Sequence, residues 1–208
     1  MLNDLLKRYP ALCVCADDIE SSKNAIIECF KNGGKLLLCG NGGSCADCDH
    51  IAGELMKGYL KKRPVSPDKK AEMKNRCNCL DDSVLDNLQC GLPAVSLPSF
   101  TALNTAFCND VDAQLVYAQA VFAMADKNDI LIALSTSGNS KNVVDAVKVA
   151  KGLGVKVIAL TGDIGGKLKT LSDISICVPE TETYKIQELH LPVYHYICAE
   201  VEDYFFER

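Results

Sequence analysis

The chain alternates short apolar runs with longer segments whose apolar residues recur at helical spacing. Each short run is bounded by Gly, Pro or polar turn residues, which is typical of a strand buried on both faces of a parallel sheet. The predicted strands are 35–39, 94–97, the apolar first part of 129–140, 155–160 and 174–178.

Helical spacing marks the segments between these runs. The N-terminal part, 1–34, contains two predicted helices within residues 2–32, interrupted at Pro10 and ending at Gly33-Gly34. Strands that alternate with helices at this spacing predict parallel βαβ units with helices on both faces of the sheet. Further helices are predicted from the turn at 40–44 to about Tyr59, over 99–110, 111–125 and 141–153, and from 183 to about 206.

One stretch departs from this pattern. From Leu60 to Gly91 the chain becomes polar, and Lys69–Leu88 within it could form a solvated helix. We expect residues 66–91 to be an insertion on the surface of a single domain that spans 1–208.

Composition and charge narrow the class of protein. With 208 residues, 48% hydrophobic residues and a net charge of −5, the chain has a globular composition and no general affinity for nucleic acid or anionic membranes. No apolar run approaches the ~20 residues needed to span a bilayer. The twelve cysteines are scattered along the chain, many of them in apolar runs, which fits reduced thiols and a cytoplasmic location. A metal site at Cys77, Cys79 and Cys90 is disfavoured because two CxxC pairs and a nearby His are lacking.

The candidate chemistry begins where strands end in small polar turns. The turn at Ser135–Ser140, STSGNS, places hydroxyl and amide donors at the predicted start of a helix, where free backbone N–H groups favour a phosphate. A polar turn that only caps the next helix is the alternative. Gly40–Ser44 and Thr161-Gly162 are similar turns, and parallel strands bring all three to one sheet edge. Neither a GxGxxG fingerprint nor a Walker motif is present, so no nucleotide cofactor is expected.

The three histidines supply candidate acid–base groups. His50 and Glu54 are spaced i, i+4 and therefore share one face of a predicted helix. On the last helix, His190 and His195 point in different directions, so only one of them is expected to face a site shared with Gln187. A solvated surface pair and a histidine satisfied by packing are the alternatives.

Six motifs, in this order along the chain, resemble the phosphoheptose isomerase branch of the sugar isomerase (SIS) domain family. They are CGNGGS at 39–44, HxxxE at 50–54, NDV at 109–111, STSGNS at 135–140, LTG at 160–162 and IQELHLPVYH at 186–195. The resemblance implies a three-layer α/β/α, flavodoxin-like parallel sheet and a homotetramer with sites between subunits. It also implies isomerisation of sedoheptulose 7-phosphate to D-glycero-D-manno-heptose 7-phosphate through an enediol.

The resemblance also assigns roles to residues. Glu54 and His195 would be the proton-transfer pair, and a zinc ion, present in some members of the family, would be held by His50, Glu54, Gln187 and His195. The residues that would bind the substrate are Asn41, Gly42, Gly43, Ser44, Asp110, Ser135, Thr136, Ser137, Asn139, Ser140 and Gln187.

Two features depart from the family pattern. The segment 66–91 is longer than the usual connection, and Tyr184 stands where family enzymes usually carry an acidic residue. Two alternatives therefore stay open: an isomerase of another sugar phosphate, and a non-catalytic SIS protein that binds a replication initiator or a regulator. The presence of His195 favours an enzyme.

Overall fold

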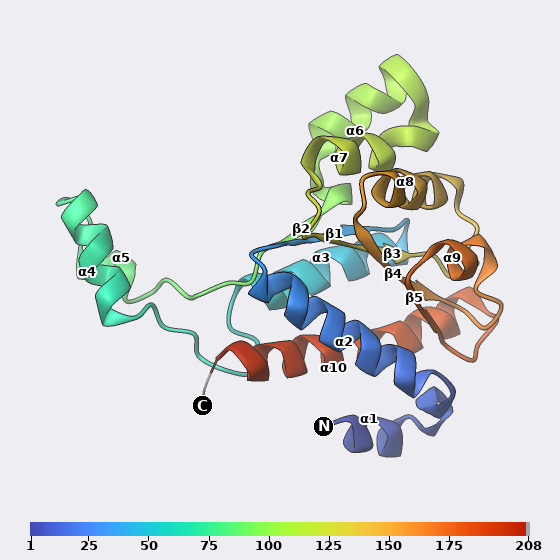
Figure 1. Ribbon diagram of the computed structural model, residues 1–208, viewed down its shortest axis with the longest axis horizontal. Helices are drawn as coiled ribbons and strands as arrows, with labels where there is room; N and C mark the ends of the chain where they lie inside the picture. The colour runs from blue at the N-terminus through green and yellow to red at the C-terminus, as the bar shows by residue number, and fades with distance from the viewer. Residues whose placement is uncertain (207–208) are drawn as a thin grey trace.

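A computed structural model describes residues 1–206 of the chain (Figure 1). Its centre is a parallel sheet with the strand order β2-β1-β3-β4-β5, which is the flavodoxin-like order. Within the described residues the strands are β1 (Leu36–Cys39), β2 (Ala94–Ser96), β3 (Ile130–Leu134), β4 (Lys156–Thr161) and β5 (Ile174–Cys177). The predicted parallel sheet is confirmed, and each strand lies where the sequence indicated one.

Both faces of the sheet are buried. On β1, Leu36 and Leu38 join the core on one face, whereas Leu37 and Cys39 join the core on the other. Successive strand residues point to opposite faces, so a run that is apolar throughout requires helices on both sides. This requirement explains why the short apolar runs in the sequence have no alternating pattern.

Two groups of helices provide this cover and complete the three predicted layers (Figure 1). On one face lie α1 (Leu2–Arg8), α2 (Ala16–Lys31), α3 (Gly43–Met56) and α10 (Thr183–Phe205). On the other face lie α6 (Thr101–Phe107), α7 (Val116–Met124), α8 (Lys141–Gly152) and α9 (Gly166–Leu171).

The N-terminal helices are interrupted at Pro10 as predicted, and the interruption has its own structure. Residues Pro10–Cys15 form a 3-10 helix, η1, between α1 and α2. Proline lacks the N–H that an α-helix needs and clashes with the preceding turn, but its fixed φ suits the first position of a new helical segment. Leu12 in η1 is fully buried, so this turn belongs to the core.

Two predictions of continuous helices are wrong in detail. The segment 99–125 contains η2 (Leu97–Ser99), α6, the π-helical η3 (Cys108–Asp112), the 3-10 helix η4 (Ala113–Leu115) and α7. Asp112 is extended and its side chain accepts a hydrogen bond from the Gln114 N–H, which starts a new helical segment there. The short helix α9 was not predicted, because the glycines before it suggested only a turn.

The predicted helix over Lys69–Leu88 is also wrong. The chain forms α4 (Pro67–Arg76) and α5 (Asp82–Leu85), which pack together away from the sheet (Figure 1). Helix α4 buries no side chain, and Asp81 in extended conformation caps the Val84 N–H, so the second helix starts anew. The Lys70–Asp86 and Lys74–Asp82 ion pairs hold the two helices together.

None of the helices in residues 1–206 has the length and apolarity needed to cross a membrane.

Candidate active site

A pocket of about 260 Å³ lies at the C-terminal ends of β1 and β3. The glycine-rich turn after β1, the STSGNS turn after β3 and the first turns of α10 contribute its walls. The lining residues are Asn41, Gly42, Gly43, Ser44, Leu134, Ser135, Thr136, Ser140, Thr183 and Gln187. The structure therefore places two of the three predicted turns in the pocket wall with Gln187. The third turn, Thr161-Gly162, does not line the pocket but lies beside the STSGNS turn, where the Gly162 N–H donates to the Thr136 carbonyl at 3.0 Å.

Three helices begin at this pocket. Gly43 is the first residue of α3, Ser140 is the N-cap of α8, and Thr183 is the first residue of α10. The first N–H groups of a helix have no intrahelical partner, and the helix dipole places positive charge there. Because all three helices direct this end towards one pocket, the pocket is suited to an anion such as a phosphate.

The hydroxyl groups of the pocket are held in place by the fold. The Oγ atoms of Ser135 and Ser140 lie 3.0 Å apart, and Ser135 is 4% exposed. The Asn41 side chain exchanges hydrogen bonds of 2.9 Å with Asn142, while the Tyr117 hydroxyl donates to the Gly40 carbonyl. An anion would therefore meet donors whose positions are largely fixed before it binds.

Two glycines in these turns leave no space for a larger side chain. A Cβ on Gly43 would lie 2.6 Å from Nε2 of Gln187, so the Gln187 amide packs directly over the first turn of α3. Gly138 has φ of +63°, and a Cβ there would lie 1.9 Å from the Gly165 carbonyl oxygen. The STSGNS turn thus packs against the turn before α9, which only glycine permits.

Three residues predicted to bind substrate do not line the pocket. The Ser137 Oγ accepts from the Asn139 N–H, and the Asn139 Oδ1 accepts from the Lys167 N–H, so both side chains hold the turn itself. Asp110 is exposed in η3, where it accepts a hydrogen bond from the Asn109 amide. Their direct contact with substrate is not supported by the single chain.

A second group of predicted residues lies between α3 and α10. His50 Nε2 lies 3.3 Å from Glu54 Oε1 and 3.4 Å from His195 Nε2. The His50 and His195 rings meet edge to face with centroids 4.9 Å apart. The other Glu54 oxygen lies 3.2 Å from the Lys57 amine. The fold thus brings together two histidines that are 145 residues apart.

Tyr194 and Asp47 orient His50, and neither was among the predicted site residues. The Tyr194 hydroxyl donates to Asp47 Oδ1 at 3.1 Å and lies 3.1 Å from His50 Nδ1. Because its one proton goes to Asp47, the hydroxyl accepts from Nδ1–H of His50. The Nε2 atom of His50 then faces Glu54 and His195. Tyr194 adjoins His195 in sequence, but only the packing of α3 on α10 shows its role.

The remaining histidines differ in environment, as predicted. His195 is partly buried, and burial, reinforced by the neighbouring His50, lowers its pKa below the usual value, although Glu54 opposes this. His190 is fully buried, with Nε2 3.3 Å from the Thr161 carbonyl oxygen, and burial lowers its pKa to about 4. His190 is a neutral core residue, and His195 is the one that faces the cluster.

Some of the ligand atoms in the cluster are spaced as a zinc ion requires, and others are not. Two ligand atoms about 2.05 Å from a tetrahedral zinc lie about 3.3 Å apart, which matches both distances from His50 Nε2. Imidazole nitrogens and a carboxylate are also ligand types that zinc accepts. However, no group of three His, Cys, Asp or Glu side chains in residues 1–206 is already arranged around a metal position, and Gln187 packs over Gly43 instead.

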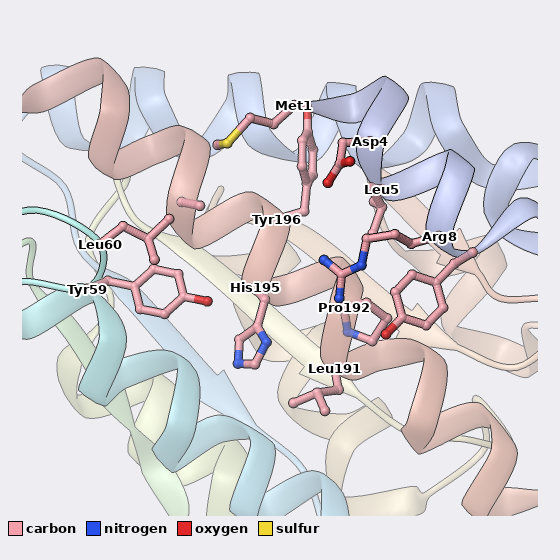
Figure 2. Close-up of a pocket in the computed structure, with 12 residues that line it drawn as sticks. Met1, Asp4, Leu5, Arg8, Tyr59, Leu60, Leu191, Pro192, His195 and Tyr196 are labelled. Atoms are coloured by element: carbon pink, nitrogen blue, oxygen red, sulfur yellow. The ribbon is translucent and has the colours of Figure 1, made fainter.

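A cavity of about 420 Å³ opens beside the cluster, between α1, the connection that follows α3 and α10 (Figure 2). Figure 2 shows the His195 ring in its wall together with Tyr59 and Arg8. The His195 ring lies 5.8 Å from the Tyr59 ring. The imidazole is therefore accessible from this side, whereas Glu54 is not among the residues that line the cavity.

Sequence comparison agrees with this geometry. A family model described as the SIS domain matches residues 11–89 and 87–162. The phosphoheptose isomerase of Aliarcobacter butzleri is 40% identical over 187 residues, which cover 90% of this chain and 85% of the relative. The phosphoheptose isomerase of Helicobacter pylori strain Shi470 is 41% identical over 184 residues, covering 88% of this chain and 82% of the relative.

Solved structures give the same result. The phosphoheptose isomerase GmhA from Neisseria gonorrhoeae superposes with a TM-score of 0.76 at 31% identity, covering 97% of this chain and 94% of the other. A phosphoheptose isomerase from Francisella tularensis gives a TM-score of 0.77 at 30% identity, covering 94% and 91%. The chain belongs to the SIS domain family, and its similarity to phosphoheptose isomerases extends over nearly its whole length.

Proposed function

We propose that the chain is a phosphoheptose isomerase that converts sedoheptulose 7-phosphate to D-glycero-D-manno-heptose 7-phosphate. One observation carries this proposal. Helices α3 and α10 both begin at the anion pocket, and about two to three turns further along they carry the cluster of His50, Glu54 and His195. A phosphosugar held at the helix starts would therefore extend along the two helices towards the acid–base groups.

The reaction moves a carbonyl from C2 to C1 of the sugar. Glu54 removes a proton from C1, and the C1–C2 bond becomes the double bond of an enediol as the carbonyl electrons move to O2. His195 protonates O2 and later takes the proton from O1, as the C1 carbonyl forms and C2 takes up the proton that Glu54 returns. Each positioned acid or base contributes about 10²–10⁴ to the rate.

The phosphate pocket contributes by positioning. Ser44, Ser135, Thr136 and Ser140, with the N–H groups of the three helix starts, hold the phosphate at one end of the substrate. Holding that end fixed lowers the entropic cost of bringing C1 and C2 to the cluster. The Asn41 and Gln187 side chains, which also line the pocket, are in position to contact sugar hydroxyls.

A zinc ion belongs to this proposal. His50, Glu54 and His195 would hold it, with Gln187 joining them after its side chain turns away from Gly43. When bound, zinc would polarise the substrate carbonyl and stabilise negative charge on the enediol oxygens. Metal analysis of the purified protein, followed by titration of the metal-free protein with zinc, tests this assignment.

We also propose a homotetramer with sites completed between subunits. The segment that carries Asp110 also carries Val111, which is 65% exposed, and Phe122 on α7 is 67% exposed. A subunit contact over these apolar side chains would bury them, and could bring Asp110 to a neighbouring pocket. Light scattering coupled to gel filtration measures the assembly. The twelve free cysteines support a cytoplasmic location, where thiols stay reduced.

The decisive experiment is an isomerase assay on the purified chain. Sedoheptulose 7-phosphate and a panel of other ketose phosphates are incubated with the protein, with and without zinc, and aldose formation is followed. Turnover of another sugar phosphate alone would point to the related isomerase, a result that Tyr184, 56% exposed near the start of α10, would help to explain. Absence of all turnover would favour the binding protein.

Matched variants test the roles. Glu54→Gln and His195→Ala should each lower kcat by about 10²–10⁴. Glu188→Gln removes an exposed carboxylate from α10 and serves as the control, for which wild-type turnover is expected. Activity that survives both site substitutions would refute the proton-transfer roles.

A further inference from the structure

A fully buried ion pair joins the two helices that carry the proposed acid–base groups. Arg63, in the connection after α3, is 1% exposed, and its Nε lies 2.8 Å from Glu202 Oε1 on α10. Burying two charges is costly, and an apolar pair of similar size is often equally stable or more stable. Stability alone therefore does not explain the pair, and the backbone groups that the two side chains bond suggest another role.

Arg63 holds the end of α3. Its Nη1 donates to the Leu55 carbonyl at 2.7 Å and its Nη2 to the Glu54 carbonyl at 3.3 Å. The last carbonyls of a helix lack intrahelical partners and carry the negative end of the dipole, so a guanidinium satisfies both needs. Arg63 thereby bonds the backbone carbonyl of Glu54, the proposed base, at the end of the helix that carries it.

Glu202, the other member of the pair, bonds the segment between α3 and Arg63. Its carboxylate accepts from the backbone N–H groups of Tyr59 at 2.8 Å, Leu60 at 2.7 Å and Lys61 at 3.1 Å. Burial favours a higher pKa for Glu202, but these N–H groups and Arg63 outweigh it and lower the pKa, so the group is ionised. Tyr59, whose ring lies 5.8 Å from the His195 ring, is fixed by the same carboxylate.

The pair also has a fixed relation to His195. Glu202 follows His195 by seven residues on α10, so the two side chains leave the same face of the helix about two turns apart. A continuous path of short polar contacts thus runs from α10 through Glu202 and Arg63 to the Glu54 carbonyl. The path bypasses the sheet and joins the two helices directly.

We propose that Arg63 and Glu202 are positioning residues, which set the distance between Glu54 and His195 rather than merely stabilising the fold. This inference rests on the proposed isomerase function for its kinetic test. A displacement of about 1 Å in an acid–base group can cost about 10²-fold in rate. Loss of the pair should therefore lower kcat much more than it changes KM.

The chain contains a matched control pair. Lys35 Nζ lies 2.6 Å from Asp129 Oδ2, and Asp129 is 3% exposed. These residues precede β1 and β3, at the sheet edge opposite the site, and they bond to each other rather than to α3 or α10. The pair shares its opposite charges and a buried carboxylate with Arg63–Glu202, although the Lys35 side chain is 28% exposed. Substitution there should affect stability without affecting the cluster.

The variants are Arg63→Lys, Arg63→Gln, Glu202→Gln and, as controls, Lys35→Gln and Asp129→Asn. Arg63→Lys keeps the charge but cannot reach Glu202 and two carbonyls together. Each variant that retains wild-type circular dichroism is assayed. We expect kcat to fall about tenfold to hundredfold in the Arg63 and Glu202 variants, with KM within about twofold of wild type, and both constants to be unchanged in the controls.

A second readout does not depend on activity. The chain has three histidines, so ring-proton NMR signals are few. In the Arg63 variants, the signals of His50 and His195 should shift because their edge-to-face rings move relative to each other, whereas the His190 signal should stay in place. If the wild type turned over no phosphosugar, the proposed function would fail while this measurement still tested the positioning role.

Three results would overturn the inference. One is a folded Arg63→Lys or Glu202→Gln protein with wild-type kcat and unchanged His50 and His195 signals. A second is an equal loss of kcat in the Lys35 and Asp129 controls, which would indicate a general effect of destabilisation. The third is complete unfolding of all Arg63 and Glu202 variants, which would make the pair essential to the fold as a whole.

Discussion

His195 Nε2 lies 3.4 Å from His50 Nε2, and this contact joins α10 to α3 at the candidate active site. The His50 nitrogen that takes part in it also lies 3.3 Å from Glu54. One imidazole therefore stands between the proposed base and the proposed acid, so changes in its orientation should affect the whole cluster.

The first prediction concerns the orientation of His50. Tyr194→Phe removes the hydroxyl that accepts from His50 Nδ1–H, and the ring can then adopt the other tautomer. Loss of such an outer partner typically lowers metal affinity by about 10–100-fold, so zinc titration should show a weaker site. Tyr196→Phe is the control, because the Tyr196 hydroxyl bonds Glu20 and not the cluster. Equal zinc affinity in the Tyr194 variant and the wild type would contradict the assigned tautomer.

The second prediction concerns the mouth of the phosphate pocket. In Gly43→Ala, the new methyl group would lie 2.6 Å from Gln187 Nε2 and push this flexible amide into the pocket. We expect KM for a phosphosugar to rise by about tenfold, equivalent to about 1.4 kcal/mol of binding energy, with a smaller change in kcat.

Gly53→Ala is the matched control for that variant. It lies in the same helix, and nothing is within 4 Å of the added Cβ. It should leave KM unchanged and stabilise the fold by roughly 0.5–1 kcal/mol, because alanine is the better helix former. A KM for Gly43→Ala equal to that of Gly53→Ala would show that Gln187 does not limit access.

The third prediction concerns the packing of the STSGNS turn. Gly138→Ala places a methyl group 1.9 Å from the Gly165 carbonyl oxygen at a φ of +63°. The turn cannot keep its contact with the segment before α9, so we expect a loss of about 2–4 kcal/mol of unfolding free energy in urea. Gly152→Ala, in the last turn of α8 with open space around it, should cost nothing.

The fourth prediction concerns acid stability. His190 has a pKa of about 4 in the folded protein, because burial disfavours its charged form, against an ordinary value of 6.5. Above pH 6.5 both folded and unfolded states hold it neutral, and as pH falls towards 4 only the unfolded state takes up the proton. Stability should therefore decrease through this window, by about 2 kcal/mol at pH 5 from this residue.

The His190→Gln variant tests whether His190 causes the predicted loss of stability at low pH. The amide can still donate to the Thr161 carbonyl but does not titrate. Urea unfolding at pH 7.5 and pH 5 should show a smaller loss of stability for the variant than for the wild type. If the two proteins lost the same free energy between these pH values, the buried neutral state assigned to His190 would be wrong.

The amino-acid sequence determined the features that depend on local pattern. Short apolar runs predicted the strands, and helical spacing predicted α8 and α10 almost to the residue. The i, i+4 spacing placed His50 and Glu54 on one helix face, and small hydroxyl residues after a strand pointed to the pocket that Ser135 and Ser140 line. These patterns need only the geometry of a single helix or strand.

The local sequence pattern did not predict the structure correctly where several weak conformational preferences compete. The helix predicted over Lys69–Leu88 divides in two, because a solvated segment without buried side chains is governed by caps such as Asp81. In the STSGNS turn, composition alone could not distinguish Ser135, which lines the pocket, from Ser137, which bonds its own turn.

Only the tertiary structure decided which distant residues meet. Arg63 and Glu202 are 139 residues apart, and Tyr194 reaches His50 across 144 residues. Such contacts follow from the packing of α3 on α10 over one face of the sheet, and no local periodicity encodes them. The sequence by itself therefore determined the strands, the helices and the chemistry they carry, whereas packing decided how the acid–base groups are aligned.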